Sequence, residues 1–63
     1  MNSKNASYNG MKFTIEEDHP EVGCYLYVFK DGECIYDTLQ DDCYMCQKVA
    51  AKKFGVPIER WEK

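Results

Sequence analysis

The sequence predicts an α+β domain in which a three-stranded antiparallel β-meander is followed by one C-terminal α-helix packed on one face of the sheet (β-β-β-α). Three observations predict this fold. Apolar and polar residues alternate from Met11 to Glu16, with the period of two that is typical of a strand with one buried face. An Asp-Gly pair at 31–32 separates two runs that are rich in aromatic and β-branched residues. Apolar residues then recur at helical spacing between Cys43 and Phe54.

The length of the chain, 63 residues, limits it to one small domain. Chains of this size bury only about 60% of the surface that they expose when unfolded, so we expect a thin core and no enzyme with a deep cleft. The net charge of −3 disfavours binding to nucleic acid. The sequence has no apolar run of the roughly 18 residues that span a membrane and no signal-peptide pattern, so we expect a cytoplasmic protein without membrane contact.

The N-terminal residues 1–10 are rich in Asn, Ser and Gly, and they offer only Ala6 and Tyr8 for burial. This composition predicts a disordered N-terminal tail, with the single β-β-β-α domain spanning residues 11–63. The first strand ends before Pro20, which has no backbone N–H to donate. We expect the acidic residues 16–18 only to keep this end of the strand solvated.

The second and third strands, residues 22–29 and 34–39, are expected to form a hairpin. Asp31 and Gly32 suit the two central positions of a type I′ turn, where both residues have positive φ. A regular ladder from this turn pairs Phe29 with Cys34, Tyr27 with Tyr36, and Tyr25 with Thr38, and all six lie on one face. The opposite face, which we expect the helix to cover, carries Cys24, Leu26, Val28, Ile35, Asp37 and Leu39.

The helix follows Gln40, with Asp41 or Asp42 as the expected N-cap and Thr38 as a rival start. It should end at Phe54, because Gly55 suits the left-handed C′ position and Pro57 prevents the helix from resuming. The apolar stripe of the helix consists of Cys43, Cys46, Val49, Ala50 and Phe54. The residues that follow offer Val56, Ile58 and Trp61 to close one edge of the core.

Four segments carry a resemblance to known proteins: residues 25–29 (Tyr-Leu-Tyr-Val-Phe), 31–32 (Asp-Gly), 39–41 (Leu-Gln-Asp) and 54–57 (Phe-Gly-Val-Pro). Through them the chain from Met11 onward resembles small uncharacterised bacterial β-β-β-α proteins, to which no activity is assigned. A weaker similarity is to the N-terminal half of HicB-type antitoxins, in which a Met-Lys-Phe-Thr strand, like residues 11–14 here, leads into further strands and a helix. This second resemblance implies a toxin as the partner.

The four cysteines are spaced C-x9-C-x8-C-x2-C, which is not the double Cys-x-x-Cys spacing of a zinc ribbon. Cys24 and Cys34 lie on opposite faces of the predicted hairpin and too far apart along it for a disulfide. We expect four independent thiols, in the core or at the surface, and no bound cofactor. The alternative is a Cys3His zinc site formed by His19, Cys24, Cys43 and Cys46, which meet at one end of the predicted domain.

One face of the predicted sheet points to a function, and it carries Tyr25, Tyr27, Phe29, Cys34 and Tyr36. One helix covers only one face of a sheet, and an exposed aromatic patch usually marks an interaction site. We therefore expect a non-enzymatic protein-interaction module that forms a homodimer through this face. The alternatives for this face are a foreign protein partner, a base-stacking platform for RNA, and coverage by Trp61 and the C-terminal residues. The second hypothesis is a zinc-stapled domain that binds a toxin or another effector there.

Overall fold

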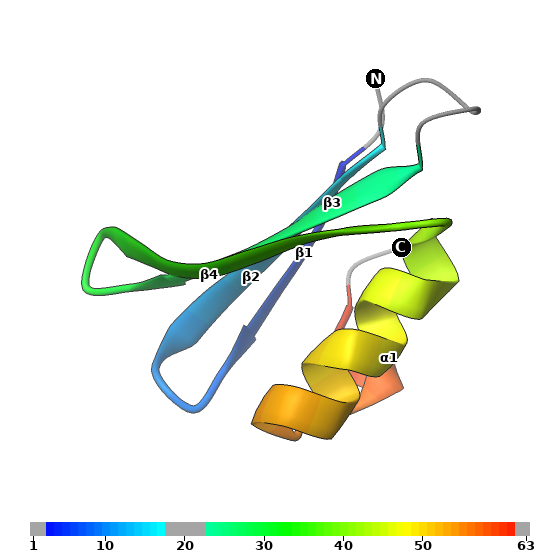
Figure 1. The fold of residues 1–63 in the computed structure, drawn as a ribbon. Helices are drawn as coiled ribbons and strands as arrows, with labels where there is room; N and C mark the ends of the chain where they lie inside the picture. The colour runs from blue at the N-terminus through cyan, green and yellow to red at the C-terminus, as the bar shows by residue number, and fades with distance from the viewer. Residues whose placement is uncertain (1–2, 18–22, 62–63) are drawn as a thin grey trace.

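The computed structural model describes residues 3–17 and 23–61, which form one antiparallel sheet with a helix packed across it (Figure 1). The elements are β1 (Ser3–Tyr8), β2 (Met11–Glu17), β3 (Cys24–Lys30), β4 (Glu33–Gln40), α1 (Cys43–Phe54) and the short 3-10 helix η1 (Ile58–Arg60). The strands pair in the order β1-β2-β3-β4. The α+β class, the antiparallel sheet and the helix are confirmed, whereas the number of strands is four and not three.

The additional strand is β1, which forms where a disordered tail was expected. Asn9 and Gly10 both have positive φ, of 55° and 78°, which is the backbone of a type I′ turn. The turn lets β1 pair with β2 along its whole length, and Ala6 lies opposite Phe13. Ala6 is buried, so a strand with one small core residue is enough to complete the sheet at this edge.

The β3–β4 hairpin has the expected turn. Asp31 and Gly32 have φ values of 53° and 80°, and Phe29 lies opposite Cys34 as a two-residue loop requires. Beyond that pair the register shifts by one residue, between Val28 and Phe29. The regular ladder predicted for this hairpin is therefore correct only next to the turn.

The shift is a β-bulge that leaves Ile35 as the extra residue of β4. Because side chains alternate between faces, one extra residue moves every later side chain of the strand to the other face. Tyr36 lies opposite Val28 and faces the helix, whereas Asp37 and Leu39 face away from it. Ile35 is 48% exposed, so the prediction that it lies beneath the helix is wrong.

Helix α1 has the predicted ends. The side chain of Asp42 accepts a hydrogen bond of 2.8 Å from the backbone N–H of Met45, which makes Asp42 the N-cap. At the other end Gly55 adopts φ 75°, and its N–H donates to the carbonyl of Ala51. None of the helices in residues 3–17 and 23–61 combines the length and the apolar character that a membrane span requires.

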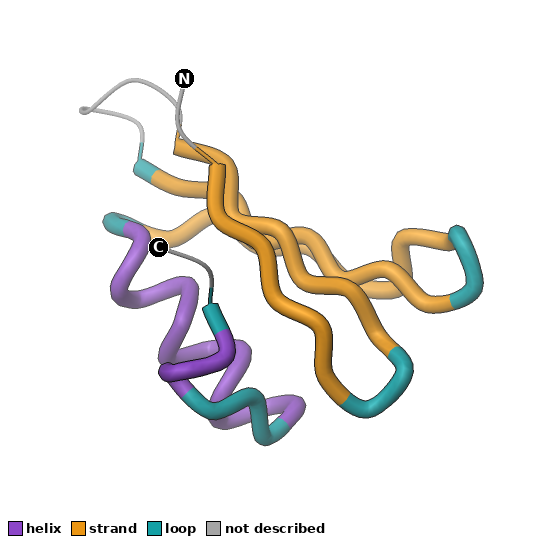
Figure 2. The backbone as a smooth tube through the Cα atoms, turned by 180° about the vertical axis from the view of Figure 1, so that it is seen from behind, coloured by secondary structure: helices purple, strands orange, loops and turns teal. Residues whose placement is uncertain are grey.

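The core lies between α1 and one face of the sheet, called here the inner face. Its buried residues are Ala6, Phe13, Ile15, Cys24, Leu26, Val28, Cys46, Ala50, Val56 and Trp61. The ring of Phe13 lies 5.5 Å from that of Phe54 and 6.3 Å from that of Trp61. Trp61 therefore packs on the inner face and does not cover the opposite one. Figure 2 shows both helical segments on the same side of the sheet.

Candidate functional site

The outer face of the sheet, opposite α1, is the first candidate site. The strand register arranges it as three rows that run across all four strands: Ser3, Glu16, Tyr25 and Leu39; Asn5, Thr14, Tyr27 and Asp37; Ser7, Lys12, Phe29 and Cys34. The rows are polar on β1 and β2 and mostly apolar on β3 and β4. The outer face is thus an aromatic surface with a polar border on one side.

The aromatic part of the outer face is a ladder of three rings along β3. The rings of Tyr25 and Tyr27 stack at 6.0 Å, and those of Tyr27 and Phe29 lie 6.4 Å apart. All three side chains are half-buried by one another, and Leu39 beside them is 47% exposed. Rings held at these spacings form a stiff apolar surface that loses little conformational freedom on binding.

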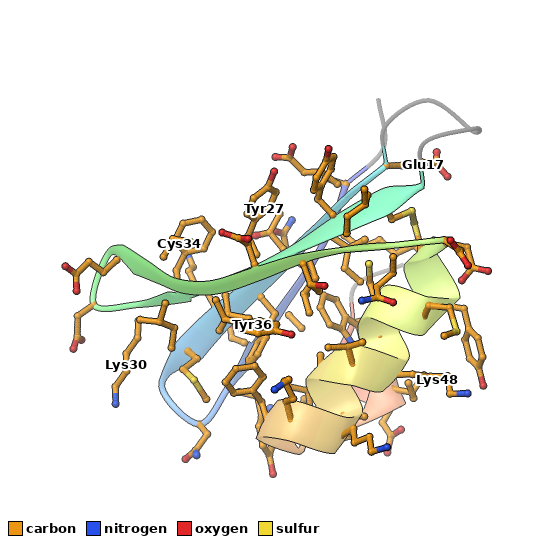
Figure 3. All side chains as sticks on the ribbon, viewed as in Figure 1. Glu17, Tyr27, Lys30, Cys34, Tyr36 and Lys48 are labelled. Carbon is orange, nitrogen blue, oxygen red and sulfur yellow. A yellow bond between two sulfur atoms is a disulfide. The ribbon has the colours of Figure 1, made fainter. Side chains whose placement is uncertain are left out.

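Tyr36 is the one residue of the predicted interaction surface that lies on the other side of the sheet. Its ring packs against Phe54 of α1 at 5.8 Å, and the Nζ of Lys53 lies 5.2 Å from the ring centre. Figure 3 shows Tyr27 pointing away from the helix and Tyr36 pointing toward it. The β-bulge at Ile35 is the cause, and it also moves Thr38 to the inner face opposite Leu26.

Charges of both signs border the aromatic ladder. Lys12 lies in the row of Phe29, and Glu16 lies in the row of Tyr25. The pKa of Tyr27 is raised, first by desolvation and then by the carboxylate of Glu16 and other neighbouring groups. Its hydroxyl therefore stays protonated at neutral pH, and the central ring of the ladder carries no charge.

The cysteine cluster at one end of the core is the second candidate site. Cys24, at the start of β3, and Cys43, at the start of α1, form a disulfide with their Cα atoms 5.4 Å apart. The thiol of buried Cys46 donates a 3.3 Å hydrogen bond to the carbonyl of Cys24. Cys34 is a free, exposed thiol on the outer face. The expectation of four independent thiols is therefore wrong, because strand β3 and the first helical turn meet here. His19 lies outside the described residues.

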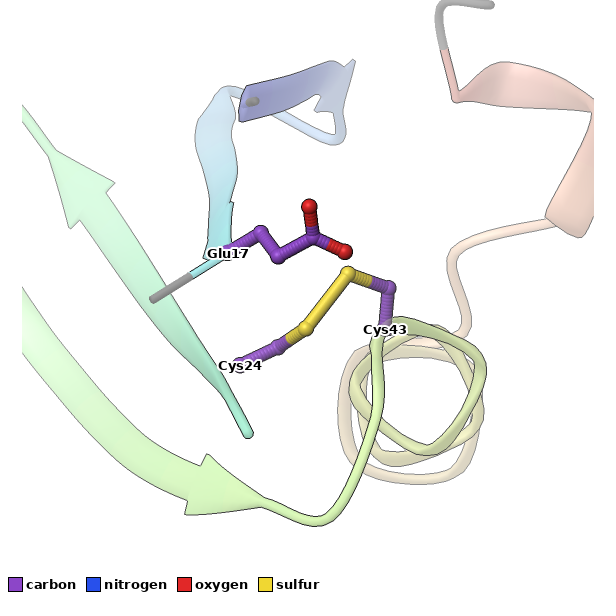
Figure 4. Close-up of side chains that lie close together, drawn as sticks. All are labelled: Glu17, Cys24 and Cys43. Atoms are coloured by element: carbon purple, nitrogen blue, oxygen red, sulfur yellow. A yellow bond between two sulfur atoms is a disulfide. The ribbon is translucent and has the colours of Figure 1, made fainter. Parts of the chain in front are cut away.

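Glu17 belongs to this cluster, and sequence reasoning missed it. A carboxylate oxygen of Glu17 and the sulfurs of Cys24 and Cys43 all lie within 4.8 Å of one another. Figure 4 shows the carboxylate pointing toward the sulfur of Cys43. The alternation of β2 could have identified it, because Glu17 lies two residues after Ile15 and four after Phe13, on the face of the strand that points to the core. The sequence prediction instead groups Glu17 with the solvated acidic residues 16–18.

Cys46 is held as a thiol. Its pKa is raised to about 11: burial and, to a smaller extent, the charge of Asp42 raise it, and an interaction with the backbone of Gln40 opposes them. The thiolate, which is the reactive form, is therefore scarce at neutral pH. This keeps Cys46 from exchanging readily with the disulfide beside it.

A third surface feature lies on the side of α1 that faces away from the sheet. It is an apolar groove between α1 and η1, lined by Tyr44, Met45, Lys48, Val49, Ala51, Lys52 and Ile58. Tyr44, Met45 and Ile58 are large apolar residues that are substantially exposed. Substitutions at these exposed side chains change a surface away from the outer face.

No protein-family model, no curated protein and no solved structure matches this chain. The resemblances to small bacterial β-β-β-α proteins and to HicB-type antitoxins therefore stay predictions. A function is inferred from the outer face and the cysteine cluster alone.

Proposed function

We propose that this protein is a small non-enzymatic interaction module that forms a homodimer by stacking the outer faces of two sheets. The ladder of Tyr25, Tyr27 and Phe29 on a face opposite the helix carries this proposal. Stacked antiparallel sheets bury such residues between them, as in β-sandwiches. A closed dimer also needs a surface that is complementary to itself, and the rows of the outer face meet that requirement.

Two arrangements with a two-fold axis between the faces are available. In the first, the axis runs across the strands through the row of Tyr27, and it exchanges the other two rows. Lys12 then lies opposite Glu16 of the second copy, and Tyr25 lies opposite Phe29. Tyr27 meets its own counterpart at the centre. Lys12 and Glu16 thus gain partners of opposite charge and the rings gain apolar partners, whereas Asp37, in the row of the axis on the edge strand β4, lies opposite its own counterpart.

In the second arrangement the axis runs along the strands between β2 and β3. It places Lys12 opposite Phe29 and Glu16 opposite Tyr25 of the second copy. Charged groups would then lose water against apolar rings without gaining a partner of opposite charge, which costs free energy. The first arrangement is the one that we propose.

The size of the face sets the expected affinity. Four strands of six to eight residues give a face of roughly 400–500 Å², taking strands about 4.8 Å apart and about 3.3 Å per residue. Stable interfaces bury about 800 Å² on each partner. We therefore expect a reversible dimer with a dissociation constant on the order of 10–100 μM.

Sedimentation equilibrium across that concentration range tests the dimer. Tyr27→Glu places a charge at its centre and should leave a monomer at every concentration. Met45→Glu places the same charge in the groove of α1 and should dimerise like the unsubstituted protein. A monomeric unsubstituted protein at millimolar concentration, or equal loss of dimer in both variants, would refute the proposal.

A charge exchange tests the arrangement. Lys12→Glu and Glu16→Lys should each weaken the dimer, because each places like charges opposite one another across the axis. The double variant restores opposite charges and should recover most of the affinity. The second arrangement predicts no recovery, because there the two residues do not meet.

The location and the alternative function are part of the same proposal. We propose the cytoplasm, where the Cys24–Cys43 pair would be kept mainly reduced. The alternative is a zinc-stapled domain that binds a toxin or another effector through the outer face, and Glu17 beside the two cysteines favours its metal-binding part. Native mass spectrometry of the reduced protein separates them by subunit count: a dimer, with or without zinc, supports the first, and a zinc-bound monomer supports the second.

A further inference from the structure

We propose that Glu17, Cys24 and Cys43 bind a zinc ion when the disulfide is reduced, so that the two sulfurs exist either as a disulfide or as zinc ligands. This site lies at one end of the core, on the inner face of the sheet, and it does not depend on the dimer. It also differs from the Cys3His set predicted from the sequence, because Glu17 takes part and the disulfide competes with the metal.

The distances suit a tetrahedral zinc ion. With Zn–S bonds of about 2.3 Å and Zn–O bonds of about 2.1 Å, ligand atoms of such a site lie roughly 3.6–3.8 Å apart. The three ligand atoms here lie within 4.8 Å of one another, and the Cα atoms of the cysteines are 5.4 Å apart. Side-chain rotations of these residues are therefore sufficient to close the site around an ion.

The ligands come from three elements that the fold holds together. Glu17 ends β2 and lies directly opposite Cys24 in the strand register, and Cys43 begins α1. The N-cap at Asp42 fixes the start of the helix beside them. Two thiolates and one carboxylate form a donor set that suits zinc, and they leave the fourth position for water or an exogenous ligand.

The two states interconvert by reduction of the disulfide and binding of zinc. Two molecules of a thiol reductant supply two electrons and two protons, the Cys24–Cys43 bond breaks, and the reductant is oxidised to its own disulfide. Zinc then displaces the protons of both cysteine thiols, which pass to the solvent. In the reverse direction, a small-molecule disulfide accepts two electrons from the two cysteine thiolates by thiol–disulfide exchange, which re-forms the Cys24–Cys43 bond, releases two small thiols and frees the ion. Zinc therefore favours the reduced state by mass action.

Each state joins the start of β3 to the start of α1 and so links the sheet to the helix. A disulfide does so covalently, and a zinc ion does so through coordinate bonds. Small domains commonly depend on one of these two devices. The proposed exchange gives this domain a cross-link in both oxidising and reducing surroundings.

Cobalt titration of the full-length protein tests the site, since Co²⁺ reports thiolate ligands by absorption and then yields to Zn²⁺. The protein reduced with a phosphine should bind one ion with thiolate-to-cobalt charge-transfer bands. The oxidised protein should bind at least about 100-fold more weakly, because it offers no thiolate at this site. Equal binding by the two forms would overturn the proposal.

Matched variants test the role of each ligand. Glu17→Gln should lower the affinity of the reduced protein by about tenfold or more, because one charged oxygen ligand is lost. Glu16→Gln, the neighbouring carboxylate on the outer face, should leave it unchanged, and so should Cys34→Ser. An unchanged affinity in Glu17→Gln would remove that residue from the site.

Folding and the dimer need separate checks. Circular dichroism of the reduced, metal-free Glu17→Gln variant should show the same secondary structure as the reduced parent, so that a loss of affinity reports the ligand and not unfolding. Tyr27→Glu should keep its cobalt spectrum while losing the dimer. Loss of both properties in that variant would show that it is unfolded, and Tyr27→Ser would then replace it in the same two measurements.

Discussion

The two faces of one strand, β3, differ in what surrounds them. Leu26 and Val28 on the inner face have no exposed surface, whereas Tyr25 and Tyr27, between and beside them in sequence, are only half-buried. The inner residues are aliphatic and fill space against the helix, and the outer residues are aromatic with polar tips. The inner face therefore supplies the core, whereas the outer face stays accessible, so neighbouring residues of β3 should respond differently to substitution.

The largest contrast is expected between Leu26→Ala and Tyr27→Ala. Leu26 is fully buried, so its truncation leaves a cavity and should cost about 2–5 kcal/mol of unfolding free energy. Tyr27→Ala should cost less than about 1 kcal/mol in the monomer, because its ring is half in solvent already. Urea denaturation at low micromolar concentration measures both values without contribution from the dimer. Equal losses would mean that the outer ring is also a core residue.

Cys43 and Cys34, near opposite ends of the sheet, should differ in how much their substitution destabilises the fold. Cys43→Ser removes a cross-link between residues 19 apart and should lower the unfolding free energy of the oxidised protein by about 3 kcal/mol. Cys34→Ser alters an exposed thiol and should change the unfolding free energy by less than about 0.5 kcal/mol. Thermal unfolding with and without reductant measures the difference. Reductant should destabilise Cys34→Ser as much as the parent and leave Cys43→Ser unaffected.

The burial of Cys46 should make the stability of the fold depend on pH. Folding raises the pKa of Cys46 from its ordinary value of 9.0 to about 11, so the folded chain retains a proton that the unfolded chain releases. This contribution to stability is complete below pH 9 and is lost as the pH rises toward 11. Cys46→Ala should therefore lose less stability than the parent across that interval, as measured by urea denaturation at each pH.

The reaction of Cys34 and Cys46 with a thiol reagent tests the burial of Cys46 independently. At pH 8 the oxidised native protein should react with a thiol reagent at Cys34 alone, and Cys46 should become reactive on unfolding. Two equally fast thiols in the native state would show that the end of the core near α1 is open.

The smallest effect is expected at Ile35, where sequence reasoning placed a core residue. Ile35→Ala should change the unfolding free energy by less than about 0.5 kcal/mol, because the residue is exposed at a bulge. Val28→Ala on the facing strand is the matched comparison and should cost about 1–3 kcal/mol. A large loss of unfolding free energy in Ile35→Ala would instead support a regular ladder without the bulge.

Local signals predicted much of this fold, because they act within a few residues. The Asp31-Gly32 turn, the Asp42 cap and the end of α1 at Gly55 each depend on backbone chemistry that a short segment contains. Strand β1 had the same kind of signal in Asn9-Gly10. It was missed because a polar edge strand with one buried residue, Ala6, gives no hydrophobic pattern.

The remaining features depend on contacts between distant segments. The bulge at Ile35 has no Gly or Pro to mark it, and its result is the packing of Tyr36 against Phe54. The place of Glu17 beside Cys24 and Cys43 depends on the register of β2 against β3 and on where α1 docks. A single-strand pattern places a residue on a face, but it does not say which other segment meets that face.

The disulfide also closes residues 24–43 of the oxidised chain into a covalent ring, and this ring contains the whole β3–β4 hairpin. A protease that cuts between Asp31 and Gly32 opens this ring without separating the two pieces, since Cys24 and Cys43 still join them. The equivalent cut between Asn9 and Gly10 lies outside the ring and frees the first nine residues from any covalent link. The two similar turns therefore differ in the effect of cleavage. A cut at 31–32 leaves the two pieces joined until the disulfide is reduced, whereas a cut at 9–10 leaves β1 without a covalent link to the rest of the sheet.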